Sequence, residues 1–316
     1  MAARRVLVTG ASGFIGRWSV PVLMNLDFDV HAVVSASRHA DVPPQLQGAT
    51  VHRSDLLDTA AIDALIDATA PSHLLHFAWI AQPGVYWHSA ENFRWLHASE
   101  HLLRRFHAAG GERVVMAGSC AEYAWPGTGL CEEYASPLAD DAAASTPAYA
   151  ACKLRLQRAL AEFSAQRRLS SAWGRIFFQY GPFEHPERLV PAVIRSLLRN
   201  EEALCSHGRQ VRSFLHAADV GAAFAALLTA RVEGPVNIGS DQPIALGELI
   251  ERIAQKVGRP ELVRLGARPA ASEPPLLIPV TRRLRDATAW RPRFNLDEGL
   301  ADVIEWWRGQ IARGNS

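Results

Sequence analysis

Residues 6–16, VLVTGASGFIG, decide the fold that we predict for this chain. An apolar, β-branched run is followed by three glycines, Gly10, Gly13 and Gly16, and then by an amphipathic stretch. Gly10 permits a tight turn, Gly13 lets the backbone approach a pyrophosphate, and Gly16 lets the next helix pack closely against the strand. Free N–H groups at the start of that helix would face the phosphates. The stretch therefore predicts a strand, a phosphate-binding loop and a helix.

The same alternation continues over the first two thirds of the chain. Buried strands are predicted over 5–9, 30–35, 50–53, 73–78 and 113–117. Helices are predicted from about residue 14, over 59–68 and over 90–109. Strands that alternate with helices form parallel sheets with helices on both faces. We therefore predict an α/β domain.

The regular alternation ends near residue 200. The following segments predict a strand or loop over 208–215, a helix over 219–228, a strand over 236–239, and helices over 246–257 and 297–307. Several prolines within 267–279 predict an extended loop. The chain is therefore divided into a large domain over 1–177, with a returning segment near 210–240, and a smaller mixed α+β lobe over 178–316.

Composition argues for an ordinary globular enzyme. The 316 residues carry a net charge of +1 and are 48% hydrophobic, so we expect neither nucleic acid nor membrane as a partner. The N-terminus lacks the long apolar segment of a signal peptide. The four scattered cysteines have neither metal-ligand spacing nor the number that a disulfide scaffold needs. We expect a cytoplasmic protein without a metal.

A second pattern, Tyr149 and Lys153, follows the fifth predicted strand. Pro147 just before it suits the first turn of a helix, and residues four apart lie on one helix face. A phenol with an ordinary pKa near 10 is a poor acid or base at neutral pH, and a nearby ammonium lowers that pKa. The pair is therefore a candidate acid–base site.

Together these motifs resemble the extended short-chain dehydrogenase/reductase family of NAD(P)-dependent nucleotide-sugar epimerases, dehydratases and reductases. Ser119 and Asn92 fall where that family has its catalytic Ser/Thr and an asparagine. The resemblance implies a Rossmann-type doubly wound parallel sheet that binds NAD(P), with a smaller mixed α+β lobe for a nucleotide sugar. It implies that Tyr149 exchanges a proton, that Ser119 orients the substrate oxygen, and that Lys153 tunes the tyrosine and holds the nicotinamide ribose.

The choice of cofactor depends on the end of the second strand. An acidic residue there would bind the ribose hydroxyl of NAD, but this chain has Ser35, with Arg38 close behind. A guanidinium can bind a 2′-phosphate in a fork. We therefore predict NADP(H) in preference to NAD. The predicted cofactor-binding residues are Gly10, Ser12, Gly13, Phe14, Ile15, Gly16, Ser35, Arg38, Asp55, Leu56, Phe77, Ala78, Tyr149 and Lys153.

The substrate prediction comes from the second half of the chain. Residues 180–191 resemble the substrate-lobe segment of dTDP-glucose 4,6-dehydratases, and residues 208–216 resemble the stretch whose arginine clamps the nucleotide diphosphate. Arginine suits that role because its fork matches phosphate oxygens. We predict a nucleoside-diphosphate sugar as substrate. The predicted substrate-binding residues are Arg188, Leu189, Arg212 and Arg268.

The residues after Ser119 argue against two reactions of the family. Dehydratases carry an acidic pair there, whereas this chain has Cys120 and Ala121; Glu122 comes one place late, on a strand or extended turn that would point it the other way. GDP-fucose synthase-like enzymes have a cysteine at the position of Ala121 and a histidine at the position of Arg188, and this chain has neither.

Three functions stay open. The favoured one is an NADPH-dependent ketoreductase that acts on a nucleoside-diphosphate keto-sugar, at the C4 carbonyl of a deoxy sugar. The second is a 4-epimerase that keeps its cofactor bound, and the third is a catalytically inactive NADP-binding sensor. The resemblance also implies a homodimer formed by the helix after Ala90 and the helix that carries Tyr149. Leu156 and Leu160 fit that interface and fit internal packing equally well.

Overall fold

Seven parallel strands form the main sheet of the computed structural model, which describes residues 4–36, 42–124, 129–270 and 273–314. The order across the sheet is β11-β7-β5-β4-β1-β2-β3. Every neighbouring pair in it is parallel. The bounds are β1 Arg5–Thr9, β2 Asp29–Ser35, β3 Thr50–Ser54, β4 His73–His76, β5 Arg113–Ser119, β7 Ser170–Ile176 and β11 Gly234–Ile238.

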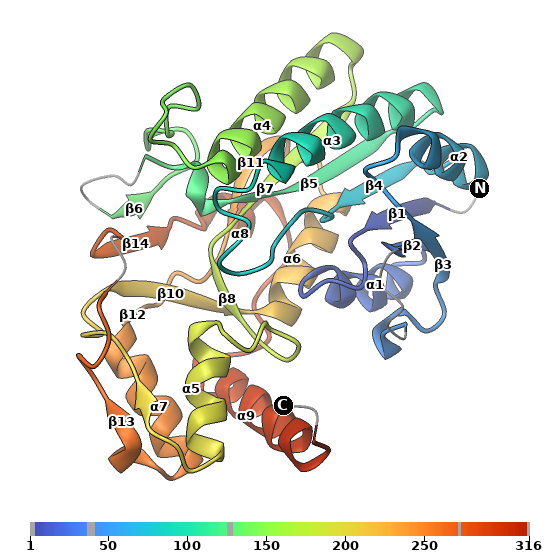
Figure 1. The fold of residues 1–316 in the computed structure, drawn as a ribbon. Helices are drawn as coiled ribbons and strands as arrows, with labels where there is room; N and C mark the ends of the chain where they lie inside the picture. Colours follow the sequence, from blue (N-terminus) through green and yellow to red (C-terminus); the bar gives the residue numbers. More distant parts are fainter. Residues whose placement is uncertain (1–3, 37–41, 125–128, 271–272, 315–316) are drawn as a thin grey trace.

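Helices cover both faces of this sheet (Figure 1). On β1, Val6 and Val8 belong to one apolar cluster and Leu7 to another, because successive side chains of a strand point to opposite faces. The first cluster includes α1 and α6, and the second includes α2, α3 and α4. Their bounds are α1 Gly16–Asn25, α2 Thr59–Thr69, α3 Glu91–Ala108, α4 Ala148–Arg167 and α6 Ala217–Thr229. The predicted doubly wound fold is confirmed.

A smaller mixed sheet lies beside the main one. Its order is β12-β10-β14-β6, and β8 also pairs with β10. β10 and β12 are antiparallel, whereas the other pairs are parallel. The bounds are β6 Leu130–Cys131, β8 Phe178–Tyr180, β10 Val211–His216, β12 Pro243–Ala245 and β14 Leu276–Pro279.

The remaining helices form a core of their own below the small sheet (Figure 1). They are α5 Leu189–Leu198, α7 Leu246–Val257 and α9 Leu296–Ala312, and the two-stranded pair β9 Ala203–Leu204 and β13 Val263–Arg264 lies beside them. The short helix α8, Arg282–Ala287, packs against β11. In the part of the chain that is described, no helix has the length and apolar character needed to cross a bilayer.

The structure corrects two expectations and decides one alternative that the sequence left open. The strand predicted over 73–78 ends at His76: the Phe77 nitrogen donates a last hydrogen bond to the Thr9 carbonyl of β1, and the Phe77 ring packs edge-on against Phe224 of α6. The extended loop predicted over 267–279 contains the strand β14, which lies between β10 and β6 in the small sheet. Leu156 and Leu160 are buried in the cluster beneath α3 and α4, so they pack internally and do not form a dimer surface.

The contact between α1 and α6 holds the helix that follows the phosphate loop. Gly221 of α6 faces α1 so closely that an added Cβ would lie 2.7 Å from Trp18 Cβ and 2.8 Å from the Ser19 nitrogen. Both neighbours belong to α1, and one of them is backbone, so neither can move without the helix. A residue larger than glycine at position 221 would therefore push α1 away from the sheet.

We expect Gly221→Ala to lower the free energy of unfolding by about 1–2 kcal/mol, because overpacking outweighs the gain in helix propensity. The matched control is Gly309→Ala in α9, where an added Cβ has only the flexible end of Arg313 nearby, at 3.5 Å. That control should be more stable than wild type by about 0.5–1 kcal/mol. Urea unfolding measures both; equal stabilisation of the two variants would show that α1 and α6 are not in tight contact.

Candidate active site

The phosphate loop requires glycine at two of its three glycine positions. Gly10 has a φ of +65°, and a Cβ there would lie 2.8 Å from the Ala78 nitrogen. A Cβ on Gly16 would lie 2.3 Å from the Gly10 carbonyl oxygen. The first contact brings the loop against the end of β4, and the second brings the first turn of α1 against the loop. The loop therefore makes the tight turn and the close helix packing that the sequence predicted.

This loop fits the pyrophosphate of a dinucleotide. The backbone N–H groups of Ser12, Phe14 and Ile15 donate to no acceptor among the described residues, and they precede the amino end of α1. Arg17 donates from Nη2 to the Ser12 carbonyl at 2.5 Å and from Nε to the Gly13 carbonyl at 3.0 Å. Those carbonyls are thereby occupied, while the amides stay available for an anion.

The end of the site that would bind the adenosine is only partly described. Ser35 is exposed at the last position of β2, in register with Ser54 of β3. Asp55 accepts a hydrogen bond from the Leu57 nitrogen at 3.0 Å, and Leu56 is buried. Arg38 lies outside the described residues, so the preference for NADP stays a prediction.

Ser119, Tyr149 and Lys153 meet where β5 ends beneath the first turns of α4. Ser119 is the last residue of β5, and Tyr149 and Lys153 lie one turn apart on α4. Burial raises the pKa of Tyr149, whereas a hydrogen bond with the Ser119 side chain lowers it. Lys153 donates to the Ala117 carbonyl at 2.8 Å, and its Nζ lies 6.0 Å from the centre of the Tyr149 ring. The three side chains therefore share one site.

Lys153 is buried, and two opposing effects determine the pKa of its ammonium group. Burial lowers the pKa of its ammonium to about 7, while the negative charge of Glu122 raises it. His76, on β4, is also buried, and burial together with the positive charge of Lys153 lowers its pKa to about 3. His76 bonds Thr9 at 2.6 Å and Ser99 at 2.9 Å. It is therefore neutral at neutral pH and does not repel the lysine.

The sequence predicted that Glu122 would lie on a strand or extended turn. The structure places it in a 3-10 helix instead. The Ser119 side chain accepts from the Ala121 nitrogen and starts a 3-10 helix over Cys120–Glu122. This turns the carboxylate of Glu122 inward, where it is fully buried and accepts from the Ser119 nitrogen and from Arg175 Nε, each at 2.7 Å. Glu122 therefore holds the backbone of Ser119.

Cys120 occupies one position of the acidic pair that dehydratases carry. Burial raises the pKa of its thiol to about 12. The thiol is therefore protonated at neutral pH and is a far weaker acid than a carboxylic acid. Its neighbour Ala121 has no ionisable group at all.

Aromatic rings that were not predicted from the sequence surround Tyr149 and Lys153. The Tyr86 ring meets the Tyr149 ring edge-on at 4.8 Å, and the Trp87 ring stacks on it at 5.9 Å. Trp79 lies over Lys153, with Nζ 3.9 Å from the ring centre. All three aromatics lie between β4 and α3. The sequence could have indicated these three aromatics as site residues, because loops that follow strands of a parallel sheet line its binding crevice.

The predicted substrate residues lie in different surroundings. Arg188 is exposed just before α5, with its guanidinium 5.6 Å from the Tyr86 ring, so it reaches the aromatic rings around Tyr149; Leu189 begins α5. Arg212 is buried on β10 and donates from Nη2 to Glu273 at 2.9 Å. Arg268 is exposed near β9, where its nitrogen donates to the Cys205 carbonyl, and no described contact joins it to Tyr149.

Comparison with known proteins agrees with this geometry. The dTDP-D-glucose 4,6-dehydratase of Mus musculus is 25% identical over 97% of this chain and 89% of its own length. The dTDP-4-dehydro-6-deoxy-D-allose reductase of Streptomyces bikiniensis is 27% identical over 97% of both. The solved structure of MoeE5 in complex with UDP-glucose and NAD matches with a TM-score of 0.78 at 30% identity, covering 97% of this chain and 99% of that one.

The profile of the NAD dependent epimerase/dehydratase family matches residues 6–239, which run from the phosphate loop through Ser119, Tyr149 and Lys153 to the last strand of the main sheet. Because this match spans most of the chain, the protein belongs to that family and is an NAD(P)-dependent enzyme of the extended short-chain dehydrogenase type.

Proposed function

We propose that this protein is an NADPH-dependent ketoreductase that acts on a nucleoside-diphosphate keto-sugar, at the C4 carbonyl of a deoxy sugar. The observation that carries the proposal is the pairing of an intact Ser119–Tyr149–Lys153 cluster with the loss of both dehydratase acids at Cys120 and Ala121. Such a site can exchange a proton at a carbonyl or hydroxyl oxygen but has no carboxylic acid placed to expel water. The reductase of Streptomyces bikiniensis is a relative with a reaction of this class.

Each residue of the cluster has a distinct part in the proposed reaction. A nicotinamide cofactor, when bound, supplies the hydride. Tyr149 donates the proton to the substrate oxygen, and Ser119, whose side chain lies beside that of Tyr149, orients that oxygen. Lys153 stabilises the phenolate that is left behind, because an ammonium favours the charged form of its neighbour. Glu122 contributes by holding the Ser119 nitrogen in place.

We propose that residues 178–316 bind the substrate and that residues 1–177, with the returning segment near 210–240, bind the cofactor. Arg212 would bind the diphosphate, and a phosphate there would replace the carboxylate of Glu273 as its partner. Arg188 lies on the Tyr86 side of the site and would contact the sugar or its phosphate. Arg268 would form a second contact with the nucleotide diphosphate.

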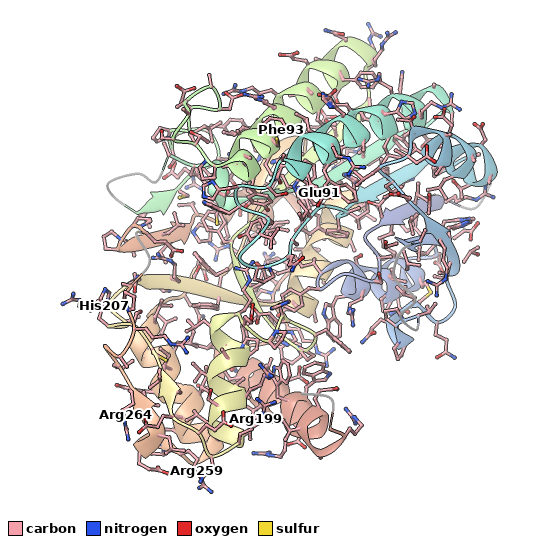
Figure 2. The ribbon with its side chains drawn as sticks, in the orientation of Figure 1. Glu91, Phe93, Arg199, His207, Arg259 and Arg264 are labelled. Atoms are coloured by element: carbon pink, nitrogen blue, oxygen red, sulfur yellow. The ribbon has the colours of Figure 1, made fainter. Side chains whose placement is uncertain are left out.

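A homodimer through α3 and α4 is part of the proposal. Support comes from Phe93, an apolar residue 40% exposed near the start of α3 (Figure 2). The surrounding surface is charged: Arg155 lies 6.0 Å from the Phe93 ring, and Glu91 pairs with Arg94. A dimer there would bury the aromatic ring and keep these charges at its rim.

A 4-epimerase is the second candidate, because it uses the same cluster and returns the hydride to the other face of the keto-sugar. The two enzymes differ in how they hold the cofactor. An epimerase has no net redox demand and keeps NAD bound, whereas a reductase exchanges NADPH with the pool. The inactive sensor is disfavoured by the intact Ser119, Tyr149 and Lys153.

We expect purified protein to release no stoichiometric NAD when it is denatured and to bind NADPH more tightly than NADH. Ser35→Asp should weaken NADPH binding about tenfold or more, because a carboxylate would repel the 2′-phosphate, and should strengthen NADH binding, because the carboxylate can accept from the ribose hydroxyl. Fluorescence titration with both cofactors measures this. Stoichiometric NAD in the denatured protein would favour the epimerase over the reductase.

We expect Tyr149→Phe to lower kcat for keto-sugar reduction by about 10²–10⁴-fold, since it removes the proton donor. The free energy of unfolding should change little, because the ring that packs against Tyr86 and Trp87 is retained. Tyr134→Phe, at a side chain that is 71% exposed, is the matched control and should keep full activity. Unchanged turnover of Tyr149→Phe would reject the proposed mechanism.

A further inference from the structure

Trp79 makes a contact with Lys153 that the proposed reaction does not yet use. The lysine is buried, and its Nζ lies 3.9 Å from the centre of the indole ring. A cation at this distance over an aromatic face is attracted by the ring quadrupole, most strongly over tryptophan and most strongly where water is excluded. Only one hydrogen-bond acceptor, the Ala117 carbonyl, is recorded for Nζ among the described residues. The indole face is therefore a main source of stabilisation for the ammonium.

The indole ring is held in this position from behind. Its Nε1 donates to Asn92 Oδ1 at 2.8 Å. Asn92 is fully buried, and its own Nδ2 donates to the carbonyls of Tyr86 and Ser89 at 2.7 and 2.8 Å. The asparagine thus joins Trp79 to the loop that carries Tyr86 and Trp87, so the ring cannot turn away from Lys153 without breaking these bonds.

We propose that Trp79 is a positioning residue: the face of its indole ring holds Lys153 in the ammonium form and aims it at the site of Tyr149. This inference rests on the proposed role of Lys153 as the charge that favours the Tyr149 phenolate. In this arrangement Trp79 does not touch the reacting atoms. It determines whether the lysine that faces them is charged.

Trp173 also faces Lys153, but its ring centre is 6.0 Å from Nζ, compared with 3.9 Å for Trp79, and the charged and titratable groups do not replace the Trp79 contact either. Glu122 on the 3-10 helix attracts the ammonium, but its carboxylate is already shared with Arg175 and the Ser119 nitrogen. Cys152 and Tyr149 lie on α4, the same helix as Lys153. His76, on β4, is neutral at neutral pH and does not attract the ammonium. Burial acts against the charge and lowers the pKa of Lys153 to about 7. Near neutral pH a modest loss of stabilisation would therefore leave most of the lysine uncharged.

The sequence offers a direct way to observe this charge, because Lys153 and Lys256 are its only lysines. Protein labelled with ¹³C,¹⁵N-lysine should give two side-chain signals in an NMR titration, and Lys256→Arg assigns them. Lys256 lies on α7, where it pairs with Asp297, and serves as an internal reference for folding and for pH. The titration requires neither substrate nor cofactor.

In Trp79→Leu, we expect the pKa of Lys153 to fall by about one unit, a tenfold change in the protonation equilibrium. Leucine is chosen because it keeps an apolar cover over the lysine, so the change reports the lost π face. Trp79→Phe, which retains a smaller ring, should give a smaller fall in the same direction. The matched control is Trp95→Phe, at a neighbouring ring 6.4 Å from Trp79, and it should leave the pKa of Lys153 as in wild type.

An unchanged or higher pKa of Lys153 in both Trp79 variants, with the Lys256 signal as in wild type, would overturn the inference. This result is separable from a failure of the proposed function, which is judged by turnover of Tyr149→Phe. A second readout uses that enzyme assay: the pH at which kcat/KM is half-maximal on the alkaline side should fall in the Trp79 variants, as the pKa of Lys153 does. A purely structural role of Trp79 would lower stability without moving either value.

Discussion

The active-site end of the sheet depends on one buried ion pair, that of Glu122 with Arg175. The two side chains are 0% and 1% exposed, and Arg175 Nε lies 2.7 Å from Glu122 Oε2. Removing one partner of such a pair leaves a buried charge without compensation and costs about 3–5 kcal/mol. Further hydrogen bonds satisfy both ions: Trp173 Nε1 donates to the carboxylate, and the guanidinium donates to the Tyr123 hydroxyl and the Glu133 carbonyl.

This network joins segments that are far apart in the sequence. Glu122 follows β5, Arg175 lies on β7, and Tyr123 donates to Asn237 on β11. Asn237 in turn donates to the Cys131 carbonyl of β6, which belongs to the small sheet. The main sheet and the small sheet are therefore connected at the point where Ser119 ends its strand. A rigid Ser119 follows from this connection, because its nitrogen is bonded to the same carboxylate.

The chemistry of the site follows from how burial acts on neighbouring groups. Burial raises the pKa of the Tyr149 phenol and lowers that of the Lys153 ammonium, so it favours the neutral form of both. The contacts with Ser119, Glu122 and Trp79 act in the opposite direction on one or the other. His76 is kept neutral beside them. Such opposed effects are typical of groups that exchange protons near neutral pH.

The sequence alone determined the phosphate loop and most strands of the main sheet. Gly10 and Gly16 are required by close backbone contacts, and such contacts demand glycine at fixed spacing, which a sequence shows directly. The pair of Tyr149 and Lys153 was also visible, because four residues are one helical turn. Six of the seven main strands were predicted within two residues at each end, since their apolar runs are local, whereas β7, Ser170–Ile176, was not predicted.

Only the tertiary structure decided what depends on distant partners. The inward turn of Glu122 requires Arg175, which is 53 residues away, and no local pattern shows that partner. The contact of Trp79 with Lys153 joins residues 74 positions apart, and the partner of Arg212 is Glu273 on a separate segment. β14 was hidden among prolines, because its pairing with β10 and β6 comes from elsewhere in the chain. Local spacing shows what one segment can form, whereas charge pairing and burial depend on which segments the fold brings together.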